Sequence, residues 1–296
     1  MPNLVNLICE AAQDLDYELI IVDDGSQDHT KNVLTELSLV YPKLRFVTII
    51  NSGAGVARNQ GCAIATKDVV LFLGDDIIPA NQAFISSHAK FHQLHPELNF
   101  AVLGKVDWPG QDTFEVTPVM RHITGPHGEQ FGFEHMSINR CYNWPFFYTC
   151  NVSVKRNVTN DWIDQGFSVT FTGAGFEDGE FAYRMEKKYG RFNIFYTDES
   201  EGLHFHRHDV TSFLRRQRFA GAMAKVLCDL HPELLPTIDF ADCLNSLKNN
   251  SLIDLNNIQR NLLLIKSILS RIEETCRSRS SLSTFRLSLF LFSFKN

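Results

Sequence analysis

The sequence predicts an α/β fold with a mostly parallel open sheet flanked by helices, and three observations support this. Residues 17–26 read YELIIVDDGS, an apolar run without polar alternation that ends in acid, Gly and Ser. Such a run indicates a strand buried on both faces, as in a parallel sheet. Strand-like and helix-like segments then alternate with short links, and carboxylates follow the strands, where open parallel sheets carry their sites.

The predicted elements can be placed in order along the chain. Residues 26–42 begin with N-cap residue types, carry apolar residues at helical spacing and stop at Pro42, which predicts a helix. The middle region, residues 105–170, is rich in aromatic residues, Gly and Pro, and we expect loops with a few strands there. The other expected helices cover residues 3–13, 54–66, 177–190, 210–228 and 254–276, and the other expected strands cover 44–50 and 68–73.

Composition narrows the classes of function. The 28 basic and 34 acidic residues leave a net charge of −6, which disfavours nucleic acid as a main partner. Seven cysteines, an odd number without a C-x-x-C pair, suggest neither a disulfide scaffold nor a zinc knuckle. The N-terminus lacks the pattern of a signal peptide, and no stretch approaches the roughly 20 apolar residues that span a bilayer. We therefore expect a cytoplasmic protein.

Two acidic pairs follow predicted strands. Asp23 and Asp24 end the first strand, and Asp75 and Asp76 follow LFLG at the end of a later one. Neighbouring carboxylates at a partly buried strand end raise each other's pKa unless a divalent cation or hydrogen-bond donors offset their charge. Carboxylate oxygens suit Mg²⁺ or Mn²⁺, which commonly bridge protein carboxylates to substrate phosphates. For a single Asp-Asp pair, a helix or turn cap is an equally good interpretation.

Between the acidic pairs lies NSGAGVARNQG, residues 51–61. Gly53 and Gly55 permit close approach of the backbone, and Arg58 follows near the start of a predicted helix. An anionic group would be well received there. Alone the motif is weak, because Gly-rich turns between strands and helices are common.

Five segments in order, IIVDDGSQDHT, NSGAGVARNQG, VVLFLGDDIIP, GFEDGEFAYRM and HFHRH, resemble the family 2 glycosyltransferases, which are inverting enzymes with a GT-A-type, Rossmann-like fold. The resemblance covers about residues 17–225. It implies that Asp23 and Asp24, with Ser26 beside them, contact the nucleoside. It also implies that Arg58 lies near the nucleotide, Asp76 ligates the metal and Asp75 contacts sugar or ribose. Gly74 stands where many relatives carry the first Asp of a DXD motif, so the metal would have either fewer protein ligands or a further ligand from elsewhere.

That further ligand is expected in GLHFHRHD, which supplies His204, His206 and His208. If the segment is extended, alternation places all three on one face, although only one need reach a metal. The resemblance implies a histidine ligand in this segment, and we choose His204 over His206. A solvated or hydrogen-bonded histidine cluster is the alternative.

The resemblance assigns the catalytic base to the Asp of GFEDGEF, hence Asp178, with Glu177 binding the acceptor or supporting the loop. Both residues begin a predicted helix, whose dipole favours the ionised form that a base needs. The implied reaction is metal-dependent transfer of a sugar from a nucleoside-diphosphate sugar, UDP-sugar by preference, to a saccharide or other acceptor hydroxyl. Polysaccharide or glycoconjugate synthesis is the expected setting. The aromatic residues Trp144, Phe146, Phe147 and Tyr148 could stack on a sugar, but a core role is the better interpretation.

The expected domains follow from the same resemblance. Residues 1–225 would form the GT-A domain, with a nucleotide-binding half at 1–104 and an acceptor-binding half at 105–225. Residues 226–296 would form a C-terminal helical extension, whose apolar tail, residues 283–296, could pack as a strand, contact the inner face of a membrane or be poorly ordered.

Members of the family open with a strand that this chain lacks, so a non-catalytic sugar- or nucleotide-binding protein, or a truncated inactive homologue, is the alternative. A nucleotidylyltransferase is disfavoured because its Gly-rich, Lys-bearing loop is absent, and a dehydrogenase because no G-x-G-x-x-G follows a first strand.

Overall fold

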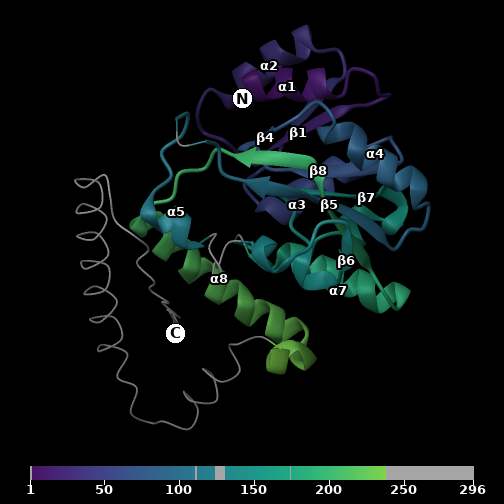
Figure 1. Ribbon diagram of the computed structural model, residues 1–296, viewed down its shortest axis with the longest axis vertical. Helices are drawn as coiled ribbons and strands as arrows, with labels where there is room; N and C mark the ends of the chain where they lie inside the picture. Colours follow the sequence, from purple (N-terminus) through teal and green to yellow (C-terminus); the bar gives the residue numbers. More distant parts are fainter. Residues whose placement is uncertain (1, 111, 124–130, 174, 238–296) are drawn as a thin grey trace. The chain divides into compact units, whose positions relative to one another are not determined.

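The computed structural model describes residues 2–110, 112–123, 131–173 and 175–237 (Figure 1). The described residues fall into two compact units, one within residues 2–114, 131–172 and 177–206, and one within residues 115–123, 173–176 and 207–237. The expected helix at 254–276 and the apolar tail lie outside the described residues. The expected division into residues 1–225 and 226–296 stays a prediction.

The predicted order of elements is confirmed through β3. Helices and strands alternate up to that point and end within a few residues of the expected bounds: α1 (Pro2–Ala11), β1 (Leu19–Asp23), α2 (Thr30–Val40), β2 (Leu44–Thr48), α3 (Ala54–Ile64) and β3 (Val69–Leu73). The next three elements, β4 (Ile77–Pro79), α4 (Phe84–Leu94) and β5 (Phe100–Asp107), were not predicted.

The second half of this unit completes the sheet and covers one of its faces. It contains β6 (Arg140–Tyr142), β7 (Asn151–Lys155), α6 (Trp162–Gln165), α7 (Glu177–Tyr189) and β8 (Asn193–His204), with 3-10 turns at Phe133–His135, Trp144–Phe146 and Arg156–Val158. The α/β class is confirmed.

Hydrogen bonding divides the strands into two sheets. β1 and β2 pair in parallel, with Leu19 opposite Leu44 and Asp23 opposite Thr48. The second sheet has the order β3-β7-β5-β8-β4, with β6 added on β8. In it, β5 and β8 are parallel and the other pairs are antiparallel. Among the described residues, β1 pairs only with β2 and β3 only with β7, so no strand hydrogen-bonds to both sheets.

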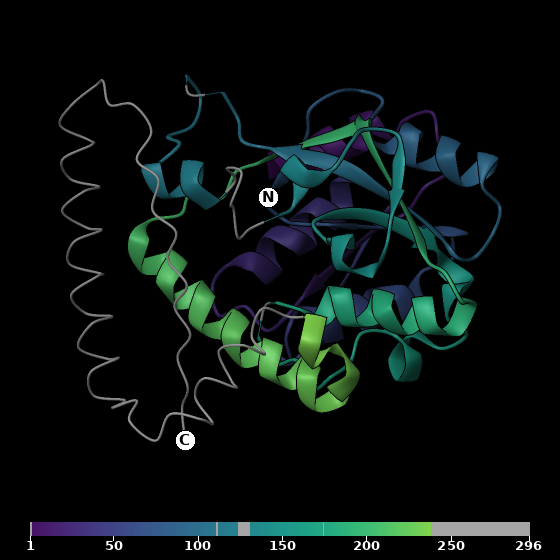
Figure 2. The same ribbon diagram turned by 60° about the horizontal axis from the view of Figure 1, so that its bottom comes forward.

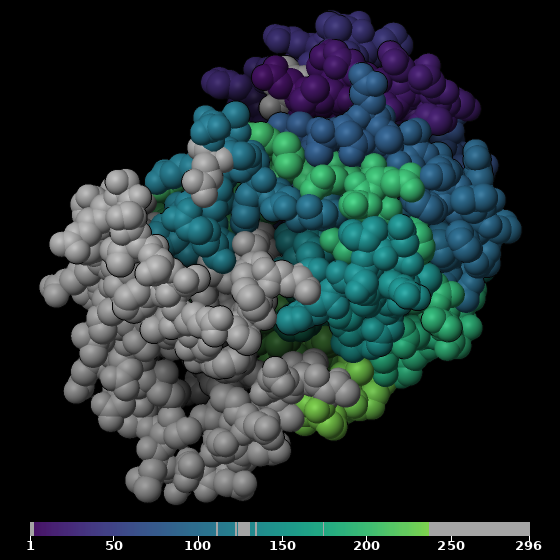
Figure 3. Space-filling view, viewed as in Figure 1, coloured from purple at the N-terminus to yellow at the C-terminus, as the bar shows by residue number. Residues whose placement is uncertain are grey.

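The central strand β5 explains why its sequence is apolar without alternation. Ala101 and Leu103 face a core that α6 and α7 cover, whereas Phe100 and Val102 face a second core beneath Phe91 of α4. Both faces of β5 are therefore shielded from water, so the strand does not need polar residues at every second position. Figure 2 shows the sheet between α4 and α7, and Figure 3 shows the purple side chains of α1 and α2 gathered at one end of the unit.

The smaller unit is helical in its described part, with α5 (Pro118–Ile123), α8 (Val210–Leu230) and a 3-10 segment at Pro232–Thr237. Asp209 caps α8 reciprocally with Ser212, since each side chain bonds the other's backbone amide. Thr117 Oγ1 donates to the carbonyl of His208 at 2.7 Å and so ties the start of α5 to this cap. None of the described helices combines the length and apolar character needed to cross a bilayer.

Candidate functional site

The first acidic pair lies at the carboxyl end of β1, where Asp23 is almost fully buried, with 4% of its surface exposed. Its Oδ1 accepts the backbone N–H of Ser26 at 2.9 Å, whereas its buried Oδ2 has no hydrogen-bond partner among the described residues. Hydrogen bonds from Ser26 hold the pKa of Asp23 below its ordinary value, against the effect of burial. One carboxylate oxygen of Asp23 is therefore a buried acceptor without a hydrogen bond among the described residues.

Asp24 is used differently. Its two carboxylate oxygens accept the backbone N–H groups of Ser52 and Gly53, at 2.7 Å and 2.9 Å. These amides precede α3, so Asp24 is itself the anionic group that this helix start receives. Gly53 has φ +94°, a conformation that favours glycine. The pairing fixes residues 51–53 against the end of β1.

Arg58 of α3 lies against the start of α7 rather than on the surface. Its Nη1 donates to Oε1 of Glu177 at 3.0 Å, and its guanidinium lies over the ring of Phe167. Glu177 is 5% exposed, and Gly55 lets Phe167 approach α3 closely, because a Cβ on Gly55 would lie 3.1 Å from Cβ of Phe167. The structure thus joins the Arg58 motif to the predicted catalytic helix.

Asp178 is the adjacent, partly buried carboxylate. Its oxygens accept the backbone N–H of Gly179 at 2.8 Å and of Thr149 at 3.4 Å. Burial, together with the negative charge of Glu177, raises the pKa of Asp178 to about 6, although Arg58 and the two amides act in the opposite direction. A carboxylate with this pKa is more basic than an ordinary aspartate and is still mostly ionised at neutral pH.

The segment Thr149–Cys150 connects this carboxylate to the second acidic pair. The amide of Thr149 reaches Asp178, and the carbonyl of Cys150 accepts the N–H of Gly74, two residues before Asp76. Burial raises the pKa of the Cys150 thiol, as do the carboxylates of Asp178 and Asp76. One short segment at the start of β7 therefore holds both acidic groups.

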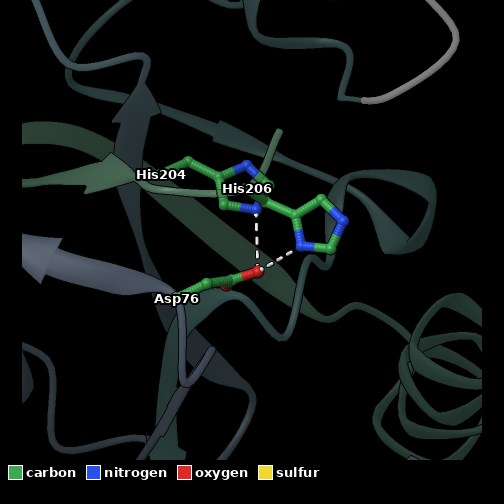
Figure 4. Close-up of side chains that lie close together, drawn as sticks. All are labelled: Asp76, His204 and His206. Atoms are coloured by element: carbon green, nitrogen blue, oxygen red, sulfur yellow. Dashed lines mark hydrogen bonds and ion pairs between the residues drawn. The ribbon is translucent and has the colours of Figure 1, made fainter. Parts of the chain in front are cut away.

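The most concentrated group of potential ligands is Asp76 with His204 and His206 (Figure 4). Nε2 of His204 and Nδ1 of His206 lie 3.2 Å and 2.9 Å from Oδ2 of Asp76. Burial alone would raise the pKa of Asp76, but the two histidine hydrogen bonds hold it well below its ordinary range. One ligand atom from each residue lies within 4.8 Å of the others, so together they could hold one metal ion.

The remaining sequence candidates lie outside this group of three. Asp75 is exposed in the turn after β3. His208 belongs to the smaller unit and is not a member of the group, so the expectation that all three histidines share a face holds for two of them. The expected convergence of Asp23, Asp24, Asp75 and Asp76 stays a prediction.

The aromatic run at residues 144–148 confirms the core interpretation. Phe147 is fully buried, and Trp144, Phe146 and Tyr148 pack against the core between the sheet and α7.

Sequence reasoning missed two residues that shape the site. Trp108 stacks on the ring of His204 with centroids 5.0 Å apart and planes 8° apart. Thr149 contributes its backbone amide to Asp178. Neither carries a motif signal, because stacking depends on distant strands meeting and any residue except proline supplies an amide.

Comparison with known proteins assigns the family. The family described as "Glycosyl transferase family 2" matches residues 2–163, which is more than half of the chain. The chain belongs to this family, and the resemblance seen in the sequence is confirmed.

Individual relatives give the same assignment. The uncharacterized glycosyltransferase YibD of Escherichia coli (strain K12) is 26% identical over 210 residues, covering 68% of this chain and 56% of the relative. The uncharacterized glycosyltransferase YfnE of Bacillus subtilis (strain 168) is 30% identical over 222 residues, covering 59% and 54%. Validoxylamine A glucosyltransferase of Streptomyces hygroscopicus subsp. jinggangensis (strain 5008) is 25% identical over 193 residues, covering 57% and 44%. The chain spans about half the length of these curated relatives.

A solved structure supports the fold class. The mannosyltransferase PcManGT from Pyrobaculum calidifontis, in complex with GDP-Man and Mn²⁺, matches with a TM-score of 0.51 at 16% identity, covering 94% of this chain and 79% of that one. At this identity the likeness concerns the fold alone, which is of the GT-A type.

Proposed function

We propose that the protein transfers a sugar from a nucleoside-diphosphate sugar to an acceptor hydroxyl, with metal dependence and inversion at the anomeric carbon. The observation that carries this proposal is that the segment Thr149–Cys150 contacts both Asp178 and Gly74, two residues before Asp76, which lies with His204 and His206 in a group that could hold one metal ion. Membership of the family supports it, as does the nucleotide sugar and Mn²⁺ named for the structural relative.

Asp76 and His204 are the residues that we propose hold the metal. Their donor atoms are an oxygen and a nitrogen 3.2 Å apart, and the low pKa of Asp76 keeps its carboxylate ionised and able to ligate. When bound, Mn²⁺ or Mg²⁺ would neutralise the charge that develops on the leaving diphosphate. The residues present fit such a cation.

The nucleotide would contact the end of β1. Oδ2 of Asp23 is a buried acceptor without a hydrogen bond among the described residues. An N–H of the base or a hydroxyl of the ribose would donate to it. Asp24 acts by positioning, since both of its oxygens already hold residues 52 and 53. Ser26 and Asp75 are exposed and could contact ribose or sugar, and we place Arg58 between the nucleotide and Glu177.

The chemical step would be a single displacement. Asp178 would accept the proton of the acceptor hydroxyl as that oxygen attacks the anomeric carbon and the diphosphate leaves from the opposite side. No covalent sugar–enzyme intermediate is needed. Glu177, which forms an ion pair with Arg58, would support the loop or contact the acceptor.

UDP-sugar is the donor that we favour, and the acceptor would be a saccharide or another hydroxyl compound in polysaccharide or glycoconjugate synthesis. The cytoplasmic location and the membrane contact of residues 283–296 stay predictions, and that tail lies outside the described residues.

The test is calorimetric titration of the purified chain with UDP and with GDP, each with and without Mn²⁺. We expect binding that requires the metal and is lost in Asp76→Ala. The matched control is Asp68→Asn, which changes an exposed aspartate just before β3, at the opposite end of that strand from Asp76. It should bind like the parent protein.

The alternative of a non-catalytic binding protein makes a different prediction. It would bind nucleotide but transfer no sugar from any donor and acceptor tested, and Asp178→Asn would then change nothing measurable. Absence of binding to either nucleotide by a folded sample would contradict the proposal itself.

A further inference from the structure

We propose that one face of α8 binds a membrane surface that carries anionic lipid headgroups. This basic face consists of Arg215, Arg218, Phe219, Ala222 and Lys225, all of which are exposed. It belongs to the described part of the smaller unit and is separate from the tail at residues 283–296. The proposal does not depend on the proposed function, because it uses no residue of the catalytic, metal or nucleotide site.

The spacing of the exposed residues defines the basic face. Arg215, Arg218, Ala222 and Lys225 follow one another at intervals of three or four residues, so they form one row along the helix. Phe219 lies one turn after Arg215 and borders this row, with 51% of its surface exposed. The other side of α8 is buried through Val210, Phe213, Met223, Ala224 and Leu227.

A glycine contact within the same unit confirms which side of α8 faces inward. A Cβ on Gly175 would lie only 3.5 Å from Cα of Ala220, so this part of the chain lies against the helix. Gly175 has φ +123°, a conformation that favours glycine. Ala220 is two residues from both Arg218 and Ala222, which places it on the opposite side of the helix from them. The contact therefore leaves the basic face uncovered.

The first half of the row carries positive charge that no neighbour neutralises. Arg215 and Arg218 form no ion pair within the part of the chain that the structure describes, whereas Lys225 pairs with Asp229 one turn later. The ring of Phe219 lies on the same helix turn as these arginines. At an anionic bilayer, the cations would meet the headgroups while the ring enters the boundary of the acyl chains.

The distribution of charge along the whole sequence favours an anionic partner for this unit. Residues 1–206 contain 15 basic and 26 acidic residues, a net charge of −11. Residues 207–296 contain 13 basic and 8 acidic residues, a net charge of +5. The overall charge of −6 thus conceals a basic C-terminal part, and such asymmetry indicates a chain that meets a negatively charged surface with one part only.

Charge and apolar exposure together select the membrane among the candidate partners. Residues 238–296 carry 8 basic and 5 acidic residues, so this segment has the same sign as the basic face and would gain no electrostatic energy by covering it. A nucleic acid would attract the arginines but is disfavoured by the acidic remainder of the chain. A bilayer offers both a plane of anions and an apolar layer for Phe219.

The test measures binding of the whole chain to lipid vesicles by co-sedimentation. Vesicles of phosphatidylcholine alone are compared with vesicles that also contain about 30% phosphatidylglycerol, an anionic lipid. We expect binding to the anionic vesicles only. Raising the salt concentration from about 0.1 M to about 0.5 M should weaken it, because salt screens charges at a surface.

Variants locate the contact on α8. Arg215→Gln combined with Arg218→Gln should weaken vesicle binding roughly tenfold or more, because each basic residue near an anionic bilayer contributes roughly a fivefold gain in affinity. The matched control is Lys31→Gln combined with Lys90→Gln, which removes the same charge from exposed positions of α2 and α4. This control should bind as the parent does, and circular dichroism checks that both variants are folded.

A second readout reports whether the face touches the apolar part of the bilayer. A tryptophan at the membrane boundary is quenched by lipids that are brominated on their acyl chains. Phe219→Trp should therefore show more quenching than the parent protein on anionic vesicles. Leu39→Trp, at a position of α2 that is 82% exposed, should show none beyond that of the parent.

The outcomes separate this proposal from the proposed function. Equal binding to neutral and anionic vesicles, no binding to either, or unchanged binding in the folded double arginine variant would overturn it. Binding of an oligonucleotide without binding of vesicles would also overturn it, because the partner would then be a soluble polyanion. Vesicle binding without nucleotide binding or sugar transfer would leave the basic face standing and contradict the proposed function alone.

Discussion

Asp178 owes its chemical character to its burial and to two charged neighbours. Burial and the charge of Glu177 raise its pKa to about 6, and the guanidinium of Arg58 limits that rise. The residue most suited to accept a proton near neutral pH is therefore tuned by an ion pair that is formed between α3 and α7.

The first prediction concerns this carboxylate. Asp178→Asn should lower kcat roughly a hundredfold or more and leave metal-dependent nucleotide binding unchanged, because a general base acts on the chemical step. In the parent protein kcat should rise with pH through about 6, since only the ionised carboxylate accepts the proton. Steady-state rates measured across this pH range, alongside calorimetry, check both statements.

A control for the pH profile uses Arg58. Its positive charge lowers the pKa of Asp178, so Arg58→Gln should move the rising limb to higher pH. Arg58→Gln combined with Glu177→Gln removes both charges and should bring the limb back toward the parent position. A limb that stays fixed in both variants would mean that another group titrates.

At the scale of elements, α4 presents an unusual polar face to the sheet. His88 and His92 lie one turn apart and are 2% and 1% exposed. Both contact the hydroxyl of Ser153 in β7: Nδ1 of His88 lies 2.8 Å from its oxygen, and Nε2 of His92 lies 2.9 Å from it. Nε2 of His88 lies 3.1 Å from Oδ1 of Asn151, whose amide donates to the carbonyl of Ser200. The network can be satisfied with both rings neutral, if Ser153 donates its hydroxyl proton to Nδ1 of His88 and accepts from Nε2 of His92.

The second prediction follows from that neutrality. Burial lowers the pKa of His88 to about 4 and that of His92 to about 3, whereas an unfolded histidine titrates at about 6.5. The stability contributed by neutral rings is therefore fully present above about pH 6.5 and is lost as the pH falls toward these values. In this window each ring lowers the free energy of unfolding by up to about 1.4 kcal/mol for every pH unit that the pH falls.

Thermal melts between about pH 7 and about pH 5 provide the measurement. His88→Gln removes one titrating ring and should reduce the fall in Tm with acid, whatever its effect on Tm at neutral pH. His29→Gln, at an exposed histidine, should leave the fall unchanged. A fall of the same size in His88→Gln would assign the acid sensitivity to other groups.

At the scale of the larger unit, the strands form two sheets of unequal size. β1 and β2 are joined only to each other among the described residues, while β5 lies between β7 and β8 within six strands. Two-stranded sheets are marginal alone, so β1 depends on α3 and on the Asp24 bonds to residues 52 and 53. The nucleotide end of the proposed site is therefore the less firmly paired end.

The third prediction is a difference in hydrogen exchange. Amides of β1 and β2 should exchange faster than those of β5 and β8, because fewer neighbouring strands must separate for them to open. Exchange followed by mass spectrometry resolves these segments, and added UDP with Mn²⁺ should slow exchange in β1. Equal protection of both sheets would indicate that β1 has a strand partner beyond those described.

Much of the fold was open to sequence reasoning because the signals are local. The apolar run at residues 17–23, the stop at Pro42 and the acidic start of α7 each act through neighbouring residues, and the structure has elements at these places. The pairing order of β3, β7, β5 and β8 could not be predicted from the sequence, because the packing of both sheet faces decides which strands pair when they are far apart in sequence.

The sequence by itself determined the family, the alternation of strands and helices and the identity of the acidic and histidine motifs, because these are properties of residues at fixed spacing. Only the tertiary structure decided how those motifs are used. It turned Asp24 toward the backbone of α3, joined Arg58 to Glu177 and brought both His204 and His206 to Asp76. The physical reason is that hydrogen bonds, burial and charge act over a few ångströms in space, and the folded chain alone sets which residues lie that close.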